Sequence, residues 1–67
     1  MRTIHATPAY LLEADVTRRD DLVTLDLYVT YPQAQNPHRV RKAQFTLPPS
    51  AVRELAACLL DSLGEQP

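Results

Sequence analysis

The chain has 67 residues, with seven basic and eight acidic side chains that give a net charge of -1. This length permits one small domain, residues 1–67, and the near-neutral charge excludes a bulk electrostatic attraction to nucleic acid or anionic lipid. A single glycine excludes a glycine-rich phosphate loop within this chain, and a single cysteine, Cys58, excludes an internal disulfide.

The first predicted strand spans about residues 9–16, where apolar and acidic side chains alternate. One face of this strand is apolar and carries Tyr10, Leu12, Ala14 and Val16. Pro8 interrupts any extension back to Ile4, so we expect an edge position or a bulge there. The polar residues 17–20 then form a connection short enough for a hairpin.

The second predicted strand spans about residues 22–31 and is expected to be central. Its odd-numbered side chains are all apolar and must therefore meet the helix predicted below: Val23, Leu25, Leu27, Val29 and Tyr31. A polar loop with Pro32 and Pro37 leads to a third strand at about residues 39–47. Strict alternation in that strand predicts that Ala43, Phe45 and Leu47 face one way and that Val40 and Lys42 face the other.

The last predicted element is an amphipathic helix over about residues 49–63. Its apolar side chains recur at the spacing of one helical face: Val52, Leu55, Ala56, Leu59 and Leu63. Pro48 and Pro49 suit the helix start, and Gly64 suits a left-handed cap at its end.

Together these elements predict an α+β fold, a three-stranded antiparallel β-meander followed by one C-terminal amphipathic α-helix packed on one sheet face (βββα). The topology resembles that of the plant AP2-type DNA-binding domain, whose exposed sheet reads DNA through arginines and tryptophans. This chain has no Trp and places Glu13, Asp15 and Asp26 on the corresponding face. We therefore do not expect that function here, because carboxylates repel phosphate.

No residue pattern indicates catalysis, a cofactor or a metal. His5 and His38 lie far apart in the chain and lack neighbouring ligands, and Cys58 has only Glu54 and Asp61 one turn away. The carboxylates Glu13 and Asp15 share a strand face, but a domain without cleft-forming loops cannot desolvate them enough to tune them as an acid and base. We expect a chain that is not an enzyme and has no cofactor.

Two binding functions remain open at this point. The first is a small non-enzymatic protein-binding module, for instance a phage or mobile-element accessory protein that inhibits or adapts a larger host complex, as anti-CRISPR proteins do. The alternative is a nucleic-acid-binding regulator that uses the basic run His38–Lys42; the same charges would also protect an edge strand from aggregation. The expected partner-binding residues are Leu22, Tyr28, Arg39, Val40, Arg41 and Lys42.

We also expect a homodimer, because a chain this short, without a disulfide or metal, buries too little surface alone. The predicted interface is the sheet face left uncovered by the helix, with Leu11, Leu22, Tyr28 and Val40. The lone thiol and the lack of a long apolar segment favour a cytoplasmic protein that does not enter a membrane.

Overall fold

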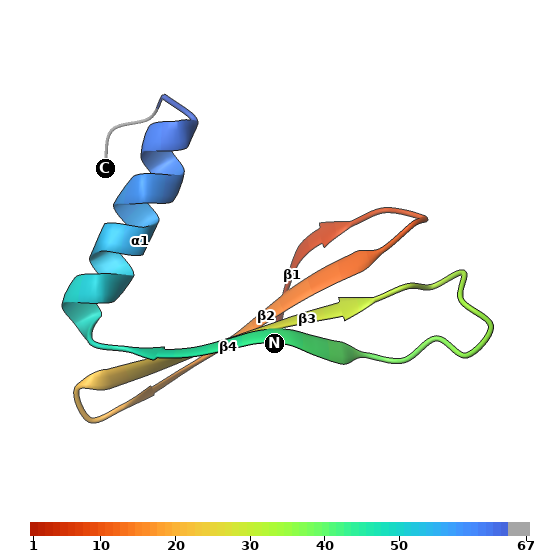
Figure 1. Ribbon diagram of the computed structural model, residues 1–67, viewed down its shortest axis with the longest axis horizontal. Helices are drawn as coiled ribbons and strands as arrows, with labels where there is room; N and C mark the ends of the chain where they lie inside the picture. Colours follow the sequence, from red (N-terminus) through yellow and green to blue (C-terminus); the bar gives the residue numbers. More distant parts are fainter. Residues whose placement is uncertain (65–67) are drawn as a thin grey trace.

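The computed structural model describes residues 1–64 and shows one antiparallel sheet followed by a helix (Figure 1). The sheet has four strands in the order β1-β2-β3-β4, and not the three that the sequence predicts. The elements are β1 (Arg2–Ala6), β2 (Leu11–Arg19), β3 (Leu22–Thr30), β4 (Val40–Leu47) and α1 (Pro49–Ser62). The α+β class and the single C-terminal helix are confirmed.

The additional strand, β1, forms an edge of the sheet by pairing with β2. Pro8 lies in the turn between them, where the Thr7 hydroxyl oxygen accepts hydrogen bonds from the amides of Ala9 (3.1 Å) and Tyr10 (3.0 Å). The Thr7 amide donates to the Tyr10 carbonyl at 2.9 Å. The proline therefore separates two strands by a tight turn, and the register of β1 is irregular between Thr3 and His5.

The hairpin between β2 and β3 is longer and tighter than expected. The two strands stay paired from Leu11 opposite Thr30 to Arg19 opposite Leu22, which leaves only Asp20 and Asp21 in the turn. Residues 17–19, predicted as a connection, therefore belong to β2. Asp20 has a positive φ of 55°, a conformation that aspartate tolerates better than most residues.

Strand β4 contains a bulge that changes which residues share a face. Ala43 pairs with Leu27, but Arg41 pairs with the next residue along β3, Tyr28, so that Lys42 is the extra residue. The bulge reverses the expected alternation before Lys42. Val40, opposite Val29, lies on the face of Leu25 and Leu27, and the prediction that Val40 shares the face of Tyr28 is wrong.

Helix α1 begins and ends close to where the sequence predicts. Pro48 is extended at the N-cap and Pro49 opens the helix; at the other end Gly64 has a φ of 77° and its amide donates to the Asp61 carbonyl at 2.9 Å. The helix packs against β3 and β4, but its axis rises away from the sheet instead of lying along it (Figure 1).

The described residues consequently lack an enclosed core. No hydrophobic side chain among residues 1–64 is fully buried. The helix packs against the sheet as predicted, but it leaves Leu55, Leu59 and Leu63 exposed instead of burying them there. The molecule is thin, with extents of 41 × 31 × 14 Å. Its radius of gyration is 14.1 Å, whereas a compact domain of this length has about 11 Å.

Candidate interaction surfaces

An open apolar groove lies between α1 and one face of the sheet. Its volume is about 1050 Å³. Strands β2, β3 and β4 contribute the floor, α1 contributes a wall, and the start of the chain lines the side at β1. The residues that define this apolar groove are Met1, Ile4, Ala14, Val16, Leu25, Leu27, Phe45, Leu55, Ala56 and Leu59, with Arg2 and Asp15 as its charged members.

The groove exposes large hydrophobic side chains that a folded chain normally covers. Phe45 in the floor is 51% exposed, Leu59 in the helical wall is 59% exposed, and Val16 is 61% exposed. The apolar faces of the helix and of the sheet, both predicted from periodicity, are thus turned toward the same space without closing it. Contiguous exposed apolar surfaces often belong to interaction sites, so this groove is a candidate for one.

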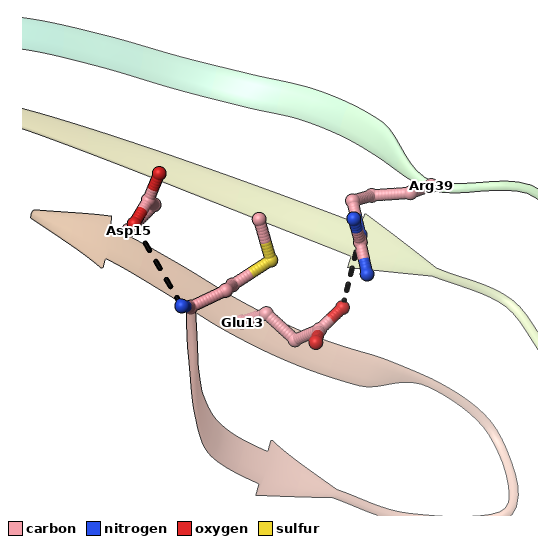
Figure 2. A network of polar contacts seen from close by, with 4 residues as sticks. Glu13, Asp15 and Arg39 are labelled. Carbon is pink, nitrogen blue, oxygen red and sulfur yellow. Dashed lines mark hydrogen bonds and ion pairs between the residues drawn. The ribbon is translucent and has the colours of Figure 1, made fainter.

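The opposite sheet face is polar and is organised by ion pairs (Figure 2). The Nε–H of Arg39 donates to Oε1 of Glu13 at 3.2 Å, and the same guanidinium lies 5.8 Å from the centre of the Tyr28 ring. Asp15 carries an oxygen 3.8 Å from the amino group of Met1. We call this surface the polar face, defined by Glu13, Asp15, Asp26, Tyr28, Arg39 and Arg41.

Asp26 is the most buried residue of the described chain, with 9% exposure, and it lies at the centre of the polar face. It pairs across the sheet with Asp15, a second carboxylate. Nη1 of Arg41 approaches its Oδ1 atom to 3.8 Å, too far for a hydrogen bond, so this oxygen has no hydrogen-bond partner in the described chain. Arg41 thus offsets the charge of a carboxylate that folding has taken out of water.

The side chains of the predicted basic run, His38–Lys42, do not all lie on one side of the sheet. Arg39 and Arg41 both turn to the polar face, where each lies beside a carboxylate, while Lys42 is the extra residue of the bulge. Leu22 and Tyr28 lie on the polar face as expected, but Val40 does not. The predicted partner-binding residues are therefore divided between two sides of the sheet.

The histidines and the cysteine, which are the candidate metal-binding or reactive groups, do not lie together in the structure. The ring of His5 lies 5.7 Å from that of Tyr10, Nδ1 of His38 lies 3.0 Å from the Asn36 carbonyl oxygen, and Cys58 is an exposed thiol on α1. Within residues 1–64 no three histidine, cysteine or acidic side chains gather as metal ligands. No helix in the same region is long and apolar enough to cross a membrane.

Comparison of the chain with family models finds no match, and comparisons with curated proteins and with solved structures find none either. The function is therefore inferred from the surfaces of this chain.

Proposed function

We propose that this chain is a small non-enzymatic protein-binding module that binds its partner in the apolar groove. The single observation that carries the proposal is the exposure of Phe45 and Leu59 across a 1050 Å³ groove in a chain that encloses no apolar core. Covering these side chains would gain about 25 cal/mol per Å² of apolar surface. A protein surface with apolar side chains is the partner that supplies such cover.

The lining of the groove favours a protein over a small ligand. Small-molecule sites combine an apolar lining with several convergent polar groups that fix the orientation of the ligand. In this groove the charged members are Arg2 and Asp15, and the other lining residues are apolar. Apolar side chains of a partner would thus find area to cover, but a small ligand would find few groups to orient it.

The ion pairs on the polar face make nucleic acid the less favoured partner. A phosphate would have to displace Glu13 from Arg39 and would leave Asp26 beside Asp15 without the compensating charge of Arg41. The carboxylates would also repel the phosphate backbone. Arg39 and Arg41 therefore already lie beside carboxylates of their own sheet face, and we favour a protein-binding module over a nucleic-acid-binding regulator.

Site-specific photocrosslinking in the cells that carry this protein tests the proposal. A photoreactive phenylalanine analogue replaces Leu59 in the groove or, as a matched control, Leu22 on the other side of the sheet, which is 48% exposed. We expect position 59 to give a discrete covalent adduct with a protein and position 22 to give none. Adducts from position 22 alone would contradict the proposed groove.

A further inference from the structure

We propose that the occupant of the apolar groove is helix α1 of a second copy of this chain, so that the module is a two-fold homodimer in which each helix fills the groove of the other. This inference rests on the proposed function, because it names the partner of the same groove. It differs from the interface predicted from the sequence, which used the opposite sheet face.

The accessible surface of the chain is the first argument. One copy exposes 5361 Å², whereas a compact monomer of this mass exposes about 4,200 Å². The excess is roughly 1,100 Å² per copy, and two copies that bury it would form an interface of about 2,200 Å² in total. That area falls in the size class of obligate homodimers, so a second copy accounts for the missing burial.

The shape of the groove is the second argument. An α-helix with its side chains is 10–12 Å wide and rises 1.5 Å per residue, so a volume of 1050 Å³ holds about seven residues, or two helical turns. The exposed apolar side chains of α1, at Leu55, Leu59 and Leu63, extend over about two turns. The chain therefore carries both the groove and an apolar helical segment of the length that fills it, as a self-complementary interface requires.

The sheet edges do not offer an equally good way to associate. Strand β4 is one edge, and it carries the bulge at Lys42 and the exposed charge of Arg41. Strand β1 is the other edge, with five residues and an irregular register after Thr3. Short, bulged and charged edges are features that disfavour strand addition.

The polar face is also a poor surface for self-association. Its central aromatic residue, Tyr28, is half-buried and has the guanidinium of Arg39 near its ring, and Asp26 lies beside it. A two-fold axis there would bring two sets of carboxylates together. Leu22 stands at one end of this face, next to the Asp20–Asp21 turn.

Sedimentation equilibrium on the full chain tests the inference with a matched pair of substitutions. We expect the wild type to have twice the 7.5 kDa mass of one chain at micromolar concentration. Leu59→Glu should raise the dissociation constant at least about 100-fold, since it places a charge in the buried interface. Leu22→Glu, the same change at a residue of similar exposure outside the groove, should leave the dimer intact.

Because folding and association bury the same side chains, Leu59→Glu affects both at once, and a second measurement therefore uses the wild type alone. In a mixture of isotope-labelled and unlabelled copies, we expect intermolecular nuclear Overhauser effects at the methyl groups of Leu55 and Leu59. Such effects at Leu22 instead would overturn the assignment to the groove. A wild type that stays monomeric up to millimolar concentration would overturn the proposal that a second copy fills the groove. A photocrosslinked adduct of position 59 with a different protein would then still support the proposed function.

Discussion

The melting temperature of this protein should depend on its concentration, because folding and association bury the same side chains. For a dimer that dissociates as it unfolds, a tenfold rise in concentration stabilises the folded state by about 1.4 kcal/mol. The unfolding entropy is about 2.1 cal/mol/K per residue, which for two chains of 67 residues amounts to about 280 cal/mol/K. The expected increase is therefore about 5 °C for each tenfold increase in concentration.

Circular dichroism melts over about a hundredfold range of concentration should accordingly move by about 10 °C. Leu22→Glu provides the control, since a charge at the far end of the polar face should leave the slope unchanged. The value of the slope is set by chain length and stoichiometry and does not depend on the strength of any single contact. Wild-type melts that coincide across the whole range would refute the reasoning, because they would show that one copy is stable without cover for its groove.

Three further predictions concern single residues. If the groove is filled, Phe45→Ala should lower the free energy of unfolding by about 3–5 kcal/mol. If the ring, which is 51% exposed in one copy, faces water, the loss should be only about 1–2 kcal/mol. Urea denaturation separates the two values. Asp26→Asn should raise the free energy of unfolding by up to about 1 kcal/mol, because it removes the repulsion from Asp15 and forfeits only a long contact with a half-exposed arginine. A loss of stability would show that this contact outweighs the repulsion. Asp20→Val should cost about 1–2 kcal/mol in the same assay because of the positive φ at this position, whereas Asp20→Gly should be neutral or stabilising.

The elements that the sequence predicts well are those with a long and regular pattern. Strand β3 has nine residues with an apolar side chain at every odd-numbered position, and α1 combines a 3.6-residue period with prolines at its start and Gly64 after its end. Strand β1 has five exposed residues, so no burial pattern marks it. It forms through backbone pairing with β2 and through the Thr7 turn, in which Pro8 separates two strands instead of ending the sheet.

The division of side chains between the two sheet faces could be predicted only in part. No glycine or proline marks the bulge at Lys42 in the sequence, so strict alternation predicts the wrong face for Val40 and gives no reason to pair Arg41 with Asp26. The apolar groove between α1 and the sheet cannot be predicted from the sequence for a different reason. Periodicity identifies the apolar side of α1 and of the sheet, but the distance between them is a property of tertiary packing.

Filling the groove changes which surface of the protein is accessible to other molecules. If the helices of two copies cover each other's grooves, Phe45 and Leu59 become internal, and the polar face of each copy remains on the outside. The paired charges of Glu13 and Arg39 then occur twice, related by the two-fold axis. A foreign molecule that approached the dimer would meet ion pairs around Tyr28 and no open apolar groove. Since Arg39 is paired with Glu13 and lies 5.8 Å from the centre of the Tyr28 ring, this face offers a foreign molecule less to bind than the open groove does, and filling the groove therefore completes the binding surface of the chain.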